Sequence, residues 1–549
     1  MRNLIVLTVL GSLAAAPTSP DAHRFERKLP AVRMEEHALS RLTFGARPGD
    51  LQAIHKLGVK KWVDLQLDPQ RIPENPALEA KLKPLETLWM TPADAVLRYP
   101  RRPAAKADGG GETDIAPSTL LTPEQLRTLR RGAPDDKRRL IASLPPDTLG
   151  RLIEALPRGG RQQLLTLVSE SDRRKILLLN APRSIPNHDL AQGKILRAVY
   201  SERQLAEVMA DFWFNHFNVN LDKGADRYLV AAYERDAIRP GVLGRFRDLL
   251  GAAARNPAML FYLDNWQSVA PSQARGNRRR GLNENYAREL LELHTLGVDG
   301  GYTQKDIVEV ARCFTGWTIR TPRLGGGFEF NERIHDKGEK VVLGVTIPAG
   351  GGMEDGERVL DILARHPATA RFISRKLAIR FVADDPPQKL VDRMAKTFTS
   401  TGGNLRAVMR TMLQSKEFWS EGAWRAKLKT PFEMAVSAVR ASGAQVDYAF
   451  PLANQIAQLG QPLYRKMEPT GYSAASVDWL NSASLVGRMN LAAALAHNRI
   501  PGVSAADIDL YASASRETRA SVDRAAEGNR PDRATLNGLV LGSPEFQRR

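Results

Sequence analysis

Residues 282–317 read LNENYARELLELHTLGVDGGYTQKDIVEVARCFTGW, and this stretch decides the predicted fold. At 100° per residue its first half has one polar face and one apolar face, as an amphipathic helix over Leu282–Leu296 requires. Gly297 is a typical residue just after a helix end, and Thr303 can begin a second helix, Gln304–Thr315, through a capping box. The stretch therefore predicts two consecutive helices joined by a short glycine-rich turn.

The same helical spacing recurs along most of the chain. Further helices are predicted over Glu36–Leu42, Asp50–Leu57, Lys60–Leu67, Glu202–Phe217, Asp226–Ile238, Ala368–Val382, Pro387–Thr399, Leu405–Leu413 and Pro431–Ser442. Residues 316–348 interrupt this pattern with three short β-type runs between glycine-rich turns: Trp317–Ile319, Phe328–Phe330 and Val341–Val345. We therefore expect a mainly α protein, a multi-helix bundle with a small inserted antiparallel β-sheet.

A repeat of about twelve residues runs from Pro134 to Asn180. Each unit begins at a Pro, Asp or Gly turn and continues into roughly two helical turns. One apolar position of each unit falls on a common register: Leu140, Leu152, Leu164 and Ile176. Stacked units would form a short α-superhelix, whose predicted role is spacing or contact with a partner.

The N-terminus predicts a secretory signal peptide over residues 1–16. A short positive region, Met1–Asn3, precedes the apolar run Leu4–Leu13, and three alanines then offer a cleavage site. Pro17 follows that site directly, so cleavage as far along as Ala22 stays open. We therefore expect a secreted or periplasmic protein, and no later stretch approaches the ~18 apolar residues of a membrane helix.

Composition changes along the chain predict its organisation after the signal. The expected units are an N-terminal helical segment (23–98), a Pro/Gly-rich linker (99–117), the helical repeat insertion (118–182) and the main helical domain (183–549). Cys313 is the only cysteine, so no intramolecular disulfide can form, and its apolar neighbours predict a buried thiol.

The formal net charge of +18 comes from basic residues spread over the whole length. We rank a solvated surface first among its explanations and contact with an anionic polymer second. Nucleic acid is the least favoured partner, because neither a zinc-finger spacing nor an aromatic RNA-binding signature accompanies the charge.

Six stretches in this order resemble the bacterial family catalogued as domain of unknown function 1800. They are HALSRLTFG (37–45), FWFNHF (212–217), MLFYLDN (259–265), the block 283–317, HDKGEKVVLG (335–344) and QPLYRKMEPTGYSAASVDWLNSASLVGRMN (461–490). Tyr472 stands where the family commonly has Trp. The resemblance implies export and a neighbouring exported protein similar to sulfatases and phosphatases, and it implies no particular reaction.

The family-like motifs concentrate polar side chains that allow two kinds of active site. In the first, His216, His335 and a carboxylate such as Asp336 bind a divalent metal that activates water, and Arg288 holds an anionic substrate group. In the second, Glu284 or Glu289 works with Asp264 as general acid and base on a glycan. The side chains expected to contact that glycan are Trp213, Trp266, Trp317, Asn218, Asn265 and Asn283.

A purely structural interpretation stays open beside these two, because the same polar groups could satisfy helix ends and form ion pairs on a solvated face. The predicted function is a hydrolase or a binder that acts on an anionic or carbohydrate polymer in the periplasm or at the cell surface. The alternative is a non-catalytic scaffold that docks the neighbouring exported sulfatase- or phosphatase-like protein through the helical repeat.

Overall fold

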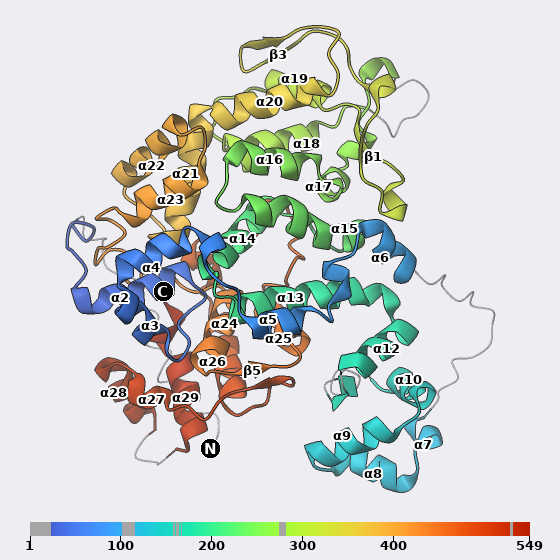
Figure 1. Ribbon diagram of the computed structural model, residues 1–549, viewed down its shortest axis with the longest axis vertical. Coiled ribbons are helices and arrows are strands. Elements are labelled where there is room, and N and C mark those ends of the chain that lie inside the picture. Colours follow the sequence, from blue (N-terminus) through green and yellow to red (C-terminus); the bar gives the residue numbers. More distant parts are fainter. Residues whose placement is uncertain are drawn as a thin grey trace.

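The computed structural model describes residues 23–100, 116–157, 160, 164–165, 167–168, 170–273, 281–526 and 531–549. The predicted signal peptide and residues 101–115 of the predicted linker lie outside the described residues. Figure 1 shows a mainly α-helical protein, with a large body of packed helices and a smaller group, α7 to α12, at its lower right. The predicted fold class is thereby confirmed.

The helices that precede the main body fall into two groups. The N-terminal group is α2 (Ala31–Leu42), α3 (Asp50–Leu57), α4 (Val59–Gln66), α5 (Pro76–Leu82) and α6 (Pro92–Arg98). The repeat group is α7 (Pro117–Leu120), α8 (Pro123–Arg131), α9 (Pro134–Ser143), α10 (Pro146–Ala155) and α12 (Glu170–Asn180).

The main body holds the remaining helices. Its first half comprises α13 (Ile185–Tyr200), α14 (Gln204–His216), α15 (Asp226–Ala232), α16 (Phe246–Arg255), α17 (Pro257–Tyr262), α18 (Glu284–Glu289) and α19 (Gln304–Cys313). Its second half comprises α20 (Glu354–Arg365), α21 (Pro367–Phe381), α22 (Gln388–Ser400), α23 (Leu405–Leu413), α24 (Pro431–Ala441), α25 (Phe450–Gln458), α26 (Ser482–Ala496), α27 (Leu510–Ser513), α28 (Arg516–Ala525), α29 (Arg533–Gly542) and α30 (Pro544–Gln547). Within the described chain, no helix is both long and apolar enough to cross a membrane.

The stretch that predicts the fold forms its two helices with one change. The first helix is α18 only as far as Glu289 and continues as a π-helix over Leu290–Thr295, closed by a Leu296 N–H to Leu291 carbonyl bond of 2.8 Å. The predicted turn follows at Gly297 (φ +84°). Thr303 caps α19 through the expected capping box.

The inserted β region forms two separate antiparallel hairpins instead of one sheet. β1 (Trp317–Ile319) pairs with β2 (Phe328–Phe330), and β3 (Lys340–Val342) pairs with β4 (Val345–Ile347). The predicted run Val341–Val345 is divided between β3 and β4 because Leu343 and Gly344 both take positive φ, as a two-residue hairpin turn requires. A further pair, β5 (Gln445–Val446) with β6 (Val503–Ser504), has no counterpart in the sequence prediction.

The repeat helices have an apolar core separate from that of the main body. Leu152, Leu164 and Ile176 are buried in it, as the common register predicts. Leu140 is only half-buried, and its neighbour Ile141 occupies the core position instead.

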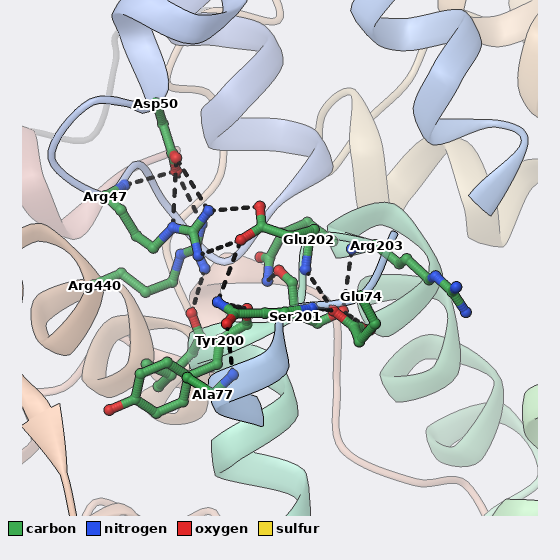
Figure 2. A network of polar contacts seen from close by, with 12 residues as sticks. Arg47, Asp50, Glu74, Ala77, Tyr200, Ser201, Glu202, Arg203 and Arg440 are labelled. Atoms are coloured by element: carbon green, nitrogen blue, oxygen red, sulfur yellow. Dashed lines mark hydrogen bonds and ion pairs between the residues drawn. The ribbon is translucent and has the colours of Figure 1, made fainter. Parts of the chain in front are cut away.

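A buried polar network ties the N-terminal segment to the main body (Figure 2). The Arg47 guanidinium donates to Asp50 at 3.3 Å and to Glu202 at 2.8 Å, and the Arg47 backbone N–H donates to Asp50 at 2.8 Å. Arg440 on α24 is 1% exposed and donates to the carbonyls of Gly45 (2.5 Å) and Val199 (2.6 Å) and to Asp50 (3.1 Å). A guanidinium that meets buried backbone carbonyls in this way fixes the packing of three chain segments at once.

Candidate functional site

The predicted residues of the β region are committed to structure. His335 is 5% exposed, and its two ring nitrogens meet the Thr315 carbonyl (2.7 Å) and Asp355 (3.2 Å). Lys340 also pairs with Asp355, at 2.7 Å. Asp336 accepts two hydrogen bonds from Arg312, at 2.9 and 3.1 Å, and this contact helps to lower the pKa of Asp336 against the opposing effect of burial.

The predicted acid and base groups lie in surface contacts. Asp264 is exposed and pairs with Lys223 at 2.7 Å. Glu284 and Arg288 both bond to Gln304, at 2.7 and 3.1 Å, and Arg288 lies 3.8 Å from Glu292. These contacts match the predicted solvated face.

Glu289 is half-buried, and burial followed by repulsion from Glu292 raises its pKa. A raised pKa is a property of many general acids. Glu289 lies on the same helix as Glu284, whereas Asp264 is held on the surface by Lys223.

The predicted glycan-contacting residues are mostly internal. Trp213 and Trp317 are fully buried, which removes them from any open cleft, and the Trp213 indole N–H donates to the Val242 carbonyl at 3.0 Å. Trp266 is half-buried and stacks on Phe261.

Two of the three asparagines of this set bond to the backbone. Asn265 is buried and donates to the carbonyls of Phe314 and Trp317, at 3.1 and 3.2 Å. Asn283 caps α18 by accepting from the Tyr286 N–H at 3.0 Å. Both amides therefore do the structural work that the purely structural interpretation assigns to them.

The predicted metal ligands do not come together. His335 and Asp336 have the partners given above, and His216 lies beside His294 in a different part of the body. Among the described residues, no three His, Cys, Asp or Glu side chains are grouped so that they could hold a metal ion. The donor set of His216, His335 and Asp336 thus does not fit the predicted divalent metal.

Two predicted residues, His216 and Asn218, line a cavity of about 360 Å³ that we call the Lys376 cavity. Its polar and charged lining residues are Lys194, Asp211, Asn215, His216, Asn218, Lys376, Arg380, Asp384, Thr430, Glu433, Gln461, Tyr464, Thr470, Tyr472, Ser473 and Arg549. They come from α13, from α14, α21 and α24 with the residues next to their ends, from the closing segment 461–475 and from the last residue, Arg549.

Asn215 joins two walls of this cavity. Its amide donates to the Tyr472 carbonyl and accepts from the Tyr472 N–H, both at 2.7 Å. Gly471 (φ +70°) packs directly on Asn215, where a Cβ atom would overlap the Asn215 carbonyl oxygen. This contact brings the family-like stretches FWFNHF and 461–490 together across the chain.

His216 is a neutral, buried histidine. Its Nε2 lies 3.1 Å from the carbonyl oxygen of His294, which can only accept, so Nε2 carries the proton. Burial, then the nearby charge of Lys376, lowers the pKa of His216 far below its ordinary value. Its Nδ1 is therefore an acceptor, and no described residue donates to it.

Lys376 is the cation of the cavity without an acidic partner. The Nζ atom makes no hydrogen bond or ion pair within the described chain, and the nearest cation–π partner is Phe372, 5.3 Å from the ring centroid. Burial lowers the pKa of this amine from its ordinary value of 10.5 to about 8. At neutral pH the amine is mostly protonated and unpaired, which favours an anion beside it.

The other charges of the cavity are paired. Lys194 lies 2.6 Å from Asp211, and Glu433 lies 2.6 Å from Arg380 and 3.2 Å from Arg549. Asp384 pairs with Lys427 and accepts from the Ser476 N–H.

Sequence reasoning missed Lys376, Arg380 and Glu433. Nothing in α21 or α24 distinguishes these residues from other charges on amphipathic helices. The signal that was present is the resemblance of 212–217 and 461–490 to one family, since those two stretches form opposite walls of the cavity.

The fold and the cavity define a mainly helical protein that has two small β-hairpins and a charged cavity lined in part by the stretches 212–217 and 461–490. The chain belongs to the family described as "Protein of unknown function (DUF1800)", whose model matches residues 37–548. No curated protein matches the chain. No solved structure matches it either.

Proposed function

We propose that the protein is an exported binding protein that holds an acidic unit of an anionic polymer, such as a uronate of a polysaccharide, in the Lys376 cavity. A volume of about 360 Å³ suits one or two sugar rings, since small-molecule sites usually span ~300–1,000 Å³. Export rests on the signal-type N-terminus, residues 1–16.

The observation that carries the proposal is the unpaired ammonium of Lys376. A charge that faces a cavity and lacks a counter-ion gains most from a ligand that supplies one. The protonated Nε2 of His216 is already used by the His294 carbonyl, and its Nδ1 is a buried acceptor, so Lys376 is the group of this wall that faces a ligand.

Binding is favoured over hydrolysis by the state of the cavity's carboxylates. Asp211, Glu433 and Asp384 each contact a cation. Each of them is thereby held away from a ligand by its cation, whereas a glycosidase needs two carboxyls that flank the scissile bond.

The test is a calorimetric titration of the full-length protein with oligogalacturonate and with a neutral oligosaccharide of equal length. We expect saturable binding of the acidic oligomer only. Lys376→Met should weaken it by about 10-fold to 150-fold, the range for a lost hydrogen bond to a charged group (about 1.5–3 kcal/mol). Arg375→Met is the matched control, because Arg375 is the exposed neighbour on the same helix. Equal losses in both variants, or none in Lys376→Met, would contradict the proposal.

The repeat supports a second candidate, the predicted scaffold for an exported sulfatase- or phosphatase-like partner. It has its own apolar core and projects from the main body (Figure 1). Arg138 and Arg139 on α9 are highly exposed, and each pairs with an aspartate three residues earlier on the same helix. If the repeat docks a partner, reversing these two charges should abolish co-purification with that protein while oligogalacturonate binding stays unchanged.

A further inference from the structure

A second cavity has a volume of about 510 Å³, and we call it the Lys429 cavity. It is lined by residues of α2, of the second half of α24, of the segment 424–429 before that helix and of the helices α27 to α30. Arg549 lines both cavities, so they share one wall.

Lys429 is the notable polar group of this second cavity. It is 8% exposed, and its Nζ lies 3.8 Å from the centroid of the Phe546 ring. Neither a hydrogen bond nor an ion pair of this Nζ is found within the part of the chain that the structure describes. Contact with an aromatic ring alone offsets only part of the free-energy cost of burying an ammonium group.

The surroundings of Lys429 contain both signs of charge: Glu433 and Glu36 attract its ammonium, and Arg425 and Arg488 repel it. Glu36 is already paired with Arg425, as is Glu545 on the cavity wall. Glu433 interacts electrostatically with Lys429, Lys427, Arg41 and Arg488 in addition to its contacts with Arg380 and Arg549. Arg41 and Arg488 are each almost completely buried and retain guanidinium N–H groups without partners. Asp384 is the other acid that interacts with Arg41 and Lys427. An additional anion in this region would therefore be attracted by several uncompensated charges.

The remainder of the cavity wall is apolar. Leu39, Val540 and Leu541 are buried side chains that line it, and Leu51, which also lines it, is 43% exposed. A ligand that fills this space gains from burying hydrocarbon as well as from its charge.

We infer that the Lys429 cavity binds an organic carboxylate with an apolar body, of the kind represented by a medium-chain fatty acid. The carboxylate would lie beside Lys429 and Arg549, and the chain would lie against Leu39, Val540 and Leu541. This site is independent of the Lys376 cavity, since each has its own unpaired lysine.

The experiment is a calorimetric titration of the full-length protein with octanoate as the probe. We expect one saturable site, at least about tenfold weaker in Lys429→Met, because the charge-assisted contact is lost. Lys376→Met should bind octanoate within about twofold of the unchanged protein, which separates this site from the proposed function.

A second variant closes the cavity without touching its charge. Ser513 is an exposed residue at the rim, so Ser513→Trp should block octanoate, whereas Ala512→Trp, on the exposed neighbour outside the lining, should not. Absence of octanoate binding, or unchanged binding in both Lys429→Met and Ser513→Trp, would overturn the inference. Acetate or inorganic phosphate binding as tightly as octanoate would overturn the assignment of an apolar body.

Discussion

Gly471→Ala should destabilise the protein through the clamp between Asn215 and Tyr472. Gly471 has φ +70°, and an L-residue in the left-handed region costs about 1–2 kcal/mol. The new Cβ would also overlap the Asn215 carbonyl oxygen and lie 2.8 Å from its Oδ1, so the closing segment must move away. That movement removes the two hydrogen bonds of 2.7 Å between Asn215 and Tyr472, each worth about 1 kcal/mol net. The sum is a loss of about 3–4 kcal/mol in the free energy of unfolding.

Urea denaturation of the purified protein measures this loss, and Gly460→Ala is the matched control. Gly460 has a similar backbone conformation, φ +93°, but a Cβ there would meet no atom within 4 Å. The free energy of unfolding of the control should therefore fall only by the cost of a left-handed backbone conformation, about 1–2 kcal/mol. If the two variants were equally stable, the clamp would contribute nothing and the reasoning would be refuted. Oligogalacturonate binding should fall in Gly471→Ala alone, because Gly471 lies between Thr470 and Tyr472, which line the Lys376 cavity, whereas neither Gly460 nor its neighbour Leu459 lines it.

Two further substitutions test buried polar contacts, and two changes of solution conditions test the proposed sites. Arg440→Met leaves the buried carbonyls of Gly45 and Val199 without their donor, and urea denaturation should show a loss of about 3–5 kcal/mol. Asp355→Asn removes the charge that Lys340 pairs with at 2.7 Å, so we expect a similar loss, which Lys340→Met in the same background should partly restore. Affinity for oligogalacturonate should fall as pH rises through about 8, where Lys376 loses its charge, and titrations from pH 7 to 9 in Lys376→Met should show no such fall. Raising salt from 0.05 to about 0.5 M should weaken octanoate binding only slightly, since buried charges are little screened, and a steep salt dependence would place the ligand on the surface instead.

The sequence predicts local structure well where one stretch contains all the determinants. Thr303 forms its capping box, and Gly297 follows the end of its helix with positive φ, because each depends on residues within one turn. The π-helix over Leu290–Thr295 was not predictable, since its hydrogen-bond register responds to packing from other elements.

The candidate site was harder to predict from the sequence, because contacts between distant elements decide which side chains line it. Trp213 and Trp317 were expected to contact a sugar, but an aromatic residue in a motif can equally fill the core, and both are fully buried. Lys376 was not predicted as a site residue because what distinguishes it is that no acidic side chain lies beside it in the described structure. That property belongs to the arrangement of α21 against α14 and cannot be seen in α21 alone.

Part of the large positive charge lies inside the protein, where it stabilises the fold. Arg41, Arg173, Arg235 and Arg440 all donate to backbone carbonyls, and Arg41 and Arg440 are almost completely buried. Such arginines replace water at the ends of helices and loops, so they hold the fold together without offering their charge to a partner. Net charge alone therefore does not identify a ligand for this protein. Lys376 and Lys429 form no ion pair within the described residues, and each lines a cavity, so a ligand bound there can neutralise their charge. A bound anion would consequently be chosen by the shape and the apolar lining of its cavity as much as by its charge.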